Sequence, residues 1–403
     1  MKQKWPILIF SALLTAFIVL AGIWGNAQFQ QLPSGGVLTA QQAAKGIAPD
    51  GWRQEAPGQW HFTFTAGEDL SSLTLCVTNT AVPLEAERLT DLARSGELYA
   101  LDVTPGETVE LVFACRRSPV PDFTKPAVIA QWGREDQTEE ILAGIALMQD
   151  AEDIFLPSQD GLRLHGQLLQ QPGAKGTILL FHGYRSSWII DFSIVLPYYY
   201  SLGYNLLAVD ERAHGQSEGV YITFGVHERR DVVTWAQYAA MHFGPDHPLF
   251  LGGLSMGATT VLLASALELP PSVRGVIADC GFSSPDAIMK SVLHAHVKWL
   301  PAGPLLALMD VCTRAFAGFS IREASTLDAV SQTKLPILFL HGTADTFVPC
   351  SMSQAAYDAC TSEKQLILVD GAKHGYSYLV DRPRVQAALA DFLEKYTSKE
   401  AIQ

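Results

Sequence analysis

The sequence is short of positive charge. Its 403 residues contain 28 Lys and Arg against 41 Asp and Glu, which gives a formal net charge of −13 at pH 7. No group of Lys and Arg is dense enough to follow a phosphate backbone, so we expect no nucleic-acid partner. Charged residues make up only 17 % of the chain and hydrophobic residues 48 %. That balance predicts a large buried core.

The sequence also lacks closely paired cysteines. None of the six cysteines forms a C-x-x-C pair, which argues against a zinc ribbon or a thioredoxin-type site. We also expect no metal and no organic cofactor. Cys76 and Cys115 both fall in a strand-rich segment and would form a disulfide in an oxidising compartment. The alternative is that both are buried free thiols.

One long hydrophobic run is present near the N-terminus. Residues 5–24, WPILIFSALLTAFIVLAGIW, carry no charge and are bracketed by Trp5 and Trp24. Twenty helical residues span about 30 Å, the thickness of the hydrocarbon core of a membrane. Trp is common at both membrane interfaces. We therefore predict that residues 1–27 form a transmembrane anchor.

The charges around this run predict its orientation. Lys2 and Lys4 precede it, and the next positive residue is Lys45. This asymmetry places the N-terminus inside and the rest of the chain outside the cell membrane as a single-pass protein. The alternative is a signal peptide cleaved after Gly25-Asn26-Ala27, which would release the protein by secretion.

Composition and periodicity divide the rest of the chain. Residues 28–50 are a polar linker. Residues 51–117 contain HFTFT, LTLCV and TVELVFAC, which alternate apolar and polar residues as the strands of a small β-rich domain do. Residues 118–150 are a Pro-rich connector with a short helix. Residues 151–397 form the last and largest domain.

This last domain alternates apolar strands with helices. After a hairpin at 154–171, the predicted strands are TILLFHG, YNLLAVD, PLFLGGLS, RGVIADC, PILFLHG and KQLILVD. The predicted helices cover 186–203, 226–243, 256–269, 353–360 and 385–396. Short, continuously apolar strands separated by helices predict an α/β fold, with a mostly parallel central sheet and helices on both faces.

Two G-x-S-x-G matches compete for the role of a nucleophile elbow, the sharp turn that exposes a catalytic serine. Ser255 lies between the strand HPLFLGG and the helix MGATTVLLASAL, which is the strand–turn–helix context that such an elbow needs. Gly253 and Gly257 keep side chains out of that turn. Ser217 is followed by VYITFG, which is no helix, so we predict a loop residue there. Ser255 is the predicted nucleophile.

A serine nucleophile needs a base and an acid that orients the base. Only His374 lies beyond the last predicted strand, in the loop GAKHGYS. His341 and His214 are interpreted as hydrogen-bonding residues of turns. Asp345 follows the strand PILFLHG and is the predicted acid. Asp370 is the competitor, but it ends the strand before the histidine loop, where Asp often serves turn geometry.

The oxyanion of the reaction needs fixed N–H donors. The backbone N–H of Met256 follows the nucleophile and starts a helix. The second donor is expected from the loop FHGYRSS, where His182-Gly183 allows a close backbone turn and Tyr184 supplies its N–H.

These segments together resemble the α/β-hydrolase superfamily over residues 151–397. FHGYRSS, DERAHGQSEG, GGLSMGA, HGTADTFVP and AKHGYS occur in the expected order. The segment around Ser217 is similar to a structural turn of the acylglycerol-lipase and serine-aminopeptidase-like branch, and the anchor is similar to that of bacterial membrane-associated hydrolases. The resemblance implies Ser255, Asp345 and His374 as the triad. It also implies Tyr184 and Met256 as oxyanion donors.

The predicted function is hydrolysis of carboxylic esters. Residues 281–335 lie where this fold inserts a lid, and they are rich in Leu, Met, Phe and Ala, which favours an acyl or lipid-like substrate. One alternative is a serine aminopeptidase-like peptidase, with Glu218 or Glu211 holding the substrate's amino group. The other is a surface binding protein with a hydrolase scaffold. The sequence leaves the oligomeric state open.

Overall fold

The computed structural model describes residues 135–296 and 302–398, together with the backbone of six strands between Ala48 and Cys115. The chain divides into two compact units, Met1–Asp122 and Phe123–Gln403. The predicted anchor at 1–27 and the Cys76–Cys115 side chains lie outside the described residues. Within the described part, no helix combines the length and apolar character needed to cross a membrane.

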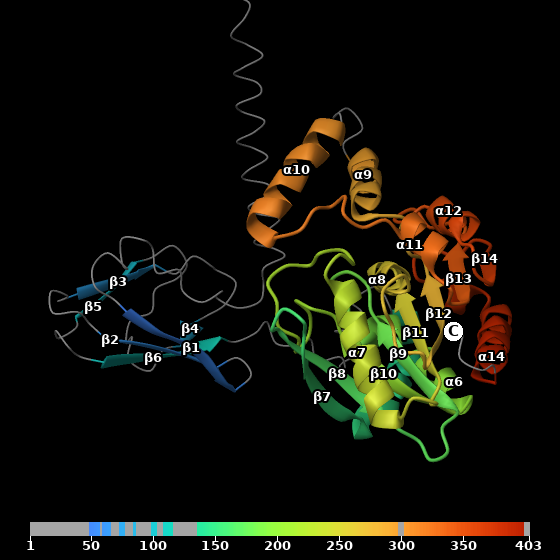
Figure 1. Cartoon of the computed structure of the whole chain (residues 1–403), viewed down its shortest axis with the longest axis horizontal. Helices are drawn as coiled ribbons and strands as arrows, with labels where there is room; N and C mark the ends of the chain where they lie inside the picture. The colour runs from blue at the N-terminus through green and yellow to red at the C-terminus, as the bar shows by residue number, and fades with distance from the viewer. Residues whose placement is uncertain are drawn as a thin grey trace, which may run out of the picture. The chain divides into compact units, whose positions relative to one another are not determined.

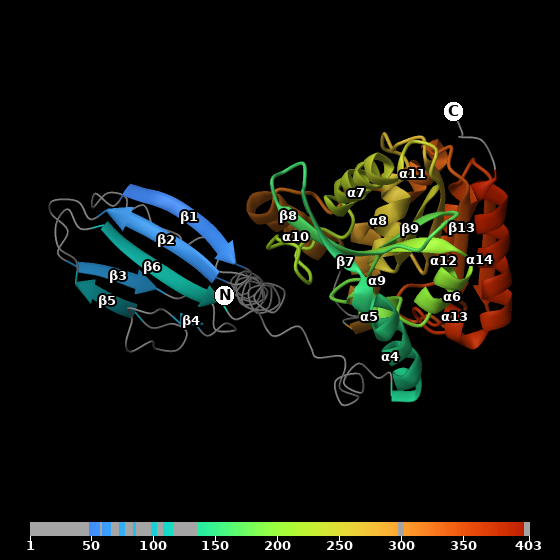
Figure 2. The same cartoon turned by 90° about the horizontal axis from the view of Figure 1, so that it is seen from below.

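The first unit contains the six strands (Figure 2). Strands β1 (Ala48–Ala56), β2 (Gln59–Thr65), β6 (Thr108–Cys115) and β4 (Leu84–Glu85) form one sheet in the order β1-β2-β6-β4, with antiparallel neighbours. Strands β3 (Ser72–Cys76) and β5 (Leu98–Asp102) form an antiparallel pair. The alternating segments HFTFT, LTLCV and TVELVFAC thus supply β2, β3 and β6, as their period of two predicts.

The second unit is built on an eight-stranded sheet in the order β14-β13-β12-β11-β9-β10-β8-β7 (Figure 1). Its strands are β7 (Glu152–Pro157), β8 (Arg163–Leu169), β9 (Gly176–Phe181), β10 (Tyr204–Asp210), β11 (Leu249–Leu254), β12 (Val273–Asp279), β13 (Ile337–Gly342) and β14 (Lys364–Val369). The six strands from β9 onward are mutually parallel, and β7 and β8 add an antiparallel hairpin at one edge. The carboxyl ends of the parallel strands therefore meet at one edge of the sheet.

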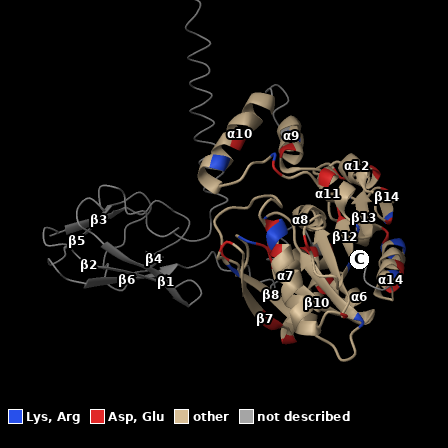
Figure 3. Ribbon diagram, viewed as in Figure 1, with Lys and Arg blue, Asp and Glu red and all other residues tan. Residues whose placement is uncertain are grey.

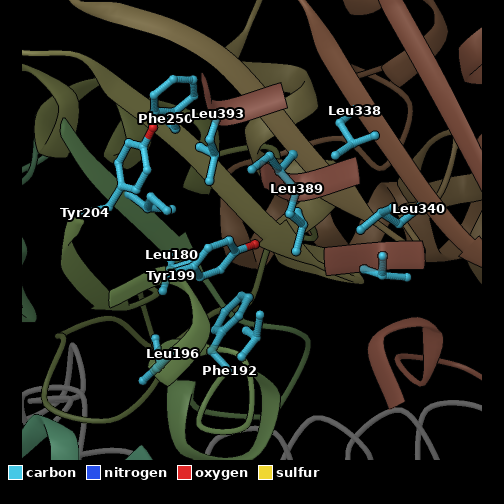
Figure 4. Close-up of a cluster of buried hydrophobic side chains, with 14 of the residues drawn as sticks. Leu180, Phe192, Leu196, Tyr199, Tyr204, Phe250, Leu338, Leu340, Leu389 and Leu393 are labelled. Atoms are coloured by element: carbon cyan, nitrogen blue, oxygen red, sulfur yellow. The ribbon is translucent and has the colours of Figure 1, made fainter. Parts of the chain in front are cut away.

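Helices cover both faces of this sheet, as the continuously apolar strands require. One face packs against α6 (Leu196–Ser201) and α14 (Arg382–Thr397). Figure 4 shows part of this core, where Tyr199 and Leu196 approach from α6, and Leu389 and Leu393 from α14. The other face packs against α7 (Glu228–Phe243), α8 (Met256–Ala264), α11 (Thr326–Gln332) and α12 (Ser351–Ala359).

The helix predicted over 186–203 is interrupted. The structure has two short helices there, α5 (Trp188–Asp191) and α6 (Leu196–Ser201). Pro197 lies in the first turn of α6, where its missing N–H is tolerated. Inside a continuous helix the proline ring would clash with the preceding turn. The single long helix was therefore a wrong prediction. The helix of the connector is α4 (Thr138–Leu147).

The predicted lid segment contains two helices before α11. They are α9 (Pro285–His296) and α10 (Ala302–Ala317), drawn in orange in Figure 1. Met289 of α9 and Leu306 of α10 share an apolar cluster with Leu263 of α8. Figure 3 shows charged residues scattered over the described elements, and only Asp310 and Arg314 are charged in α10. The segment thus forms a largely apolar cap near α8.

Candidate active site

Ser255 occupies a strained turn between β11 and α8. Its backbone φ is 56° and its ψ is −114°. Residues other than glycine rarely adopt a positive φ. A Cβ on Gly253 would lie 2.3 Å from the Gly257 carbonyl oxygen, and one on Gly257 would lie 1.8 Å from the Phe181 carbonyl oxygen. Both glycines are therefore required by close backbone contacts. This is the turn that the sequence predicted.

His374 connects Ser255 to Asp345. The Ser255 hydroxyl lies 2.9 Å from His374 Nε2, and His374 Nδ1 lies 2.6 Å from Asp345 Oδ2. The side chain of His374 is 26 % exposed, whereas that of Asp345 is fully buried. The Phe347 ring meets the imidazole edge-on, with 5.1 Å between the ring centroids. The structure thus brings the three predicted triad residues into one hydrogen-bonded chain.

The Asp345 carboxylate accepts four hydrogen bonds. Oδ1 accepts from the backbone N–H groups of Phe347 and Val348, both at 2.8 Å. Oδ2 accepts from His374 and, at 3.2 Å, from Nε2 of His341. Burial by itself raises the pKa of Asp345, but these hydrogen bonds outweigh it and hold the pKa well below its ordinary value. Asp345 is therefore ionised at neutral pH.

The two competing residues lie elsewhere. Asp370 is exposed, and its carboxylate accepts a hydrogen bond from the Thr343 hydroxyl at 3.0 Å. Ser217 is fully buried, donates to the Asp210 carbonyl oxygen at 2.6 Å and accepts from the His165 N–H at 2.8 Å. Ser217 therefore ties the turn after β10 to β8, as a loop residue would.

The predicted oxyanion loop runs close to the elbow. A Cβ on Gly183 would lie 3.3 Å from the Ser255 Cβ. The Gly183 N–H donates to Asp191 Oδ2 at 2.6 Å, and Tyr184 is the next residue of the loop. Met256 begins α8, and the first amides of a helix have no partner inside it. The loop and the helix start therefore both lie next to the elbow.

Two buried histidines support this loop, and their positions in the sequence do not predict that they act as a pair. His182 Nδ1 donates to the Gly183 carbonyl at 2.8 Å, while Nε2 accepts from the Glu211 N–H at 3.1 Å. His214 Nδ1 donates to the Arg212 carbonyl at 2.9 Å, and Nε2 accepts from the Arg185 N–H at 3.0 Å. Both rings therefore need the neutral form. Burial lowers the pKa of His214 and lowers that of His182 to about 3.

Neither carboxylate proposed for a substrate amino group belongs to the triad's hydrogen-bonded chain. Glu218 Oε2 accepts the Arg163 N–H at 2.8 Å and closes the turn next to β8. Glu211 is only 2 % exposed, and burial raises its pKa well above the ordinary value. A buried carboxyl with a raised pKa is poorly suited to hold a cationic amino group.

One group of potential metal ligands occurs among the described residues. Ligand atoms of Cys280, Asp345 and His374 lie within 4.8 Å of one another. Two of these residues already bond each other, and burial raises the pKa of the Cys280 thiol well above its ordinary value. A metal needs the thiolate, so this set is a poor metal site. We assign no metal here.

Apolar side chains flank the serine on two sides. The first set is a cluster around Met256 that includes Phe282, Val348, Tyr184 and, from α9, Ile288. The second set lines a pocket between α5, α6, β11, α13 (Ser377–Val380) and α14. The pocket reaches Leu254 and Gly375, the neighbours of Ser255 and His374 in the chain. Both regions adjoin the hydrogen-bonded chain.

Known proteins share this architecture. A protein of Bacillus subtilis, YqkD, named as uncharacterized, is 28 % identical over 242 residues, which cover 59 % of this chain and 78 % of that protein. Caffeoylshikimate esterase of Arabidopsis thaliana is 24 % identical over 286 residues, which cover 60 % and 84 %. The solved structure of the Pyrococcus furiosus esterase Pf2001 has a TM-score of 0.52 at 22 % identity, covering 63 % of this chain and 94 % of that one.

The structural likeness to the Pyrococcus esterase establishes the α/β-hydrolase fold for the second unit. The family model described as serine aminopeptidase, S33 matches residues 172–302 and 284–378. These two matches include the elbow, the predicted oxyanion loop, Asp345 and His374, and together they cover about half of the chain. The chain therefore belongs to the serine aminopeptidase (S33) family of α/β-hydrolases.

Proposed function

We propose that this protein cleaves carboxylic esters through an acyl-enzyme intermediate on Ser255. The observation that carries the proposal is the hydrogen-bonded chain from Ser255 through His374 to Asp345, with 2.9 and 2.6 Å between successive polar atoms. A serine hydroxyl is a weak nucleophile until a neighbouring base takes its proton. Here the base is directly in reach, and its other nitrogen is held by an ionised carboxylate.

In the proposed reaction, His374 Nε2 takes the Ser255 proton as Oγ attacks the ester carbonyl. The Asp345 carboxylate stabilises the imidazolium that forms. The N–H groups of Tyr184 and Met256 donate to the oxyanion of the tetrahedral intermediate. His374 then protonates the leaving alcohol, and a water molecule, activated by the same histidine, releases the acid product.

We place the acyl group in the apolar cluster around Met256. Met256 follows the nucleophile directly, Val348 belongs to the Asp345 turn, and α9 contributes Ile288 from above. Met256 is fully buried and Ile288 is 5 % exposed, so the cluster must open to admit an acyl chain, and we propose that α9 moves to do so. Movement of a cap helix is a common gating step in hydrolases.

The test is an ester series with a matched inactive protein. Purified full-length protein and its Ser255→Ala variant would be assayed with p-nitrophenyl esters from acetate to palmitate and with amino-acid p-nitroanilides. We expect ester hydrolysis in the wild type only, with the optimal chain length reporting the room beneath α9. Equal ester hydrolysis in the variant would refute the proposal. Cleavage of the anilides alone would favour the peptidase alternative.

We also propose that residues 5–24 anchor the protein in the cell membrane, with the α/β-hydrolase unit outside. The support is the uncharged run of twenty residues and the lysines before it. Membrane fractions washed with alkaline carbonate should retain the protein, and protease added to intact spheroplasts should degrade the hydrolase unit. Release of the protein into the medium would instead support cleavage of a signal peptide.

A further inference from the structure

A second histidine contacts the acid of the triad. His341 is the fifth residue of β13 and is completely buried. Its Nε2 lies 3.2 Å from Asp345 Oδ2, the same oxygen that accepts the proton of His374 Nδ1. The place of His341 at the end of a predicted strand indicates a residue that stabilises a turn. The contact with Asp345 adds a role that this interpretation does not include.

The partners of His341 fix the direction of its hydrogen bonds. Nε2 also lies 2.9 Å from the carbonyl oxygen of Val348, which can only accept. Nε2 therefore carries a hydrogen, shared between Val348 O and Asp345 Oδ2. On the other side of the ring, Nδ1 lies 2.7 Å from the hydroxyl of Ser353 in α12. The ring is thus held at both nitrogens, and it cannot rotate without losing bonds on both sides.

These bonds determine how the Asp345 carboxylate is presented. His341 holds Oδ2 directly, and through Val348 O it holds the turn whose two amides bind Oδ1. A carboxylate without these contacts could rotate about its terminal torsion, which is broad and only weakly restrained. Rotation would move Oδ2 away from His374 Nδ1. In a fully buried site no water replaces the lost contact.

We propose that His341 is a positioning residue of the triad: through Asp345 Oδ2 it sets the orientation and the tautomer of His374. A series of hydrogen bonds, called the relay below, therefore extends from Ser353 through His341, Asp345 and His374 to Ser255. This inference rests on the proposed function for its catalytic consequence. The geometric part, which is the control of the Asp345–His374 bond, can be measured without any substrate.

Two amide substitutions separate the contributions of the two ring nitrogens. In His341→Gln, the side-chain nitrogen can occupy the position of Nε2 and still donate to Asp345. In His341→Asn, the shorter side chain reaches the position of Nδ1 beside Ser353 and leaves Asp345 without this donor. Both variants are polar and smaller than histidine, and Asn leaves the larger gap because it is one methylene shorter than Gln. They differ in this packing and in the contact with Asp345.

For the full-length protein, we expect His341→Asn to lower kcat by about 10- to 100-fold with KM changed less than about threefold, because the bond acts on the base and not on substrate binding. His341→Gln should recover most of kcat. The far-downfield proton NMR signal of the His374 Nδ1–H, which reports its bond to Asp345, should shift or broaden in His341→Asn and persist in His341→Gln. Thermal unfolding of both variants, with midpoints well above the assay temperature, would show that loss of folding does not cause the difference.

Wild-type kcat and an unchanged His374 signal in a folded His341→Asn protein would overturn the proposal. If that variant does not fold, Ser353→Ala tests the same relay, because it frees Nδ1 and leaves Asp345 untouched. It should also shift or broaden the His374 signal, and an unaltered signal would count against this proposal. If the wild type hydrolyses no ester, the proposed function fails, but the NMR comparison still decides whether His341 controls the Asp345–His374 bond.

Discussion

Lowering the pH should lower the free energy of unfolding, because His182, which supports the predicted oxyanion loop, is buried in its neutral form. His182 is completely buried, and its two ring nitrogens have opposite roles, one donating to the Gly183 carbonyl and the other accepting from the Glu211 N–H. A second proton would place one N–H against another. Burial, with a smaller contribution from the nearby His214, lowers the pKa of His182 to about 3 in the folded protein.

The size of the effect follows from the difference between the folded and unfolded pKa values. The unfolded chain has a His pKa of about 6.5, so below that pH it binds a proton that the folded protein does not bind. The contribution of neutral His182 to the stability of the fold is therefore complete above about pH 6.5 and is lost as the pH falls toward 3. Each pH unit inside this window removes about 1.4 kcal/mol, so at pH 5 the loss due to His182 alone is about 2 kcal/mol.

The measurement is urea unfolding of wild type and His182→Gln at pH 8, 7, 6 and 5, followed by tryptophan fluorescence. Trp188 and Trp235 are buried in the α/β-hydrolase unit and report its unfolding. Glutamine does not titrate, and its oxygen can still accept from Glu211. We expect the variant to be less stable by about 1–2 kcal/mol at pH 8, because the bond to Gly183 is lost. This gap should close or reverse at pH 5.

The comparison between the two proteins removes the effect of other titrating groups that they share. A stability gap that stays constant from pH 8 to pH 5 would refute the reasoning, since it would mean that His182 takes up its proton equally in the folded and unfolded states. A gap that widens in acid would show that the folded protein binds the proton more tightly than the unfolded chain.

Three further predictions concern other parts of the second unit. Ser217→Ala should keep kcat, because that hydroxyl only ties a turn, while losing about 1–3 kcal/mol of stability in urea unfolding. Gly257→Ala should lose at least about 3 kcal/mol or fail to fold, because its Cβ would lie 1.8 Å from the Phe181 carbonyl oxygen. Arg212→Met should lose about 3–5 kcal/mol, because it leaves the buried Asp231 carboxylate without the guanidinium that binds both its oxygens.

Matched variants control two of these predictions. Gly303→Ala changes a helical glycine with nothing within 4 Å of the new Cβ, so it should be neutral or slightly stabilising. Asp160→Asn removes the other partner of Arg212, but this carboxylate is 54 % exposed, so a loss of less than about 1 kcal/mol is expected. Equal losses of stability in Gly257→Ala and Gly303→Ala would contradict the role given to the close backbone contact. Equal losses in Arg212→Met and Asp160→Asn would contradict the role given to burial. A large fall in kcat for Ser217→Ala would contradict the assignment of Ser255.

Local sequence patterns determined the framework of the second unit. Continuous apolar runs bounded by turns predicted the parallel strands, because a strand covered on both faces has no polar side to show. The contrast between Ser255 and Ser217 was also readable, since one serine joins a strand to a helix and the other does not. Chain order then singled out His374, the one histidine after the last strand.

The tertiary structure decided features that depend on residues far apart in the chain. The interruption between α5 and α6 follows from Pro197 and from how this segment packs, and 3.6-residue periodicity alone does not show it. The sequence already favoured Asp345 over Asp370 from its place after a strand, and the structure adds the 2.6 Å contact with His374, 29 residues away. The second contact of Asp345, from His341, and the pairing of His182 with the Glu211 amide depend on how strand ends meet at one edge of the sheet. Hydrogen bonds of this kind depend on distance and angle, which spacing along a sequence does not specify.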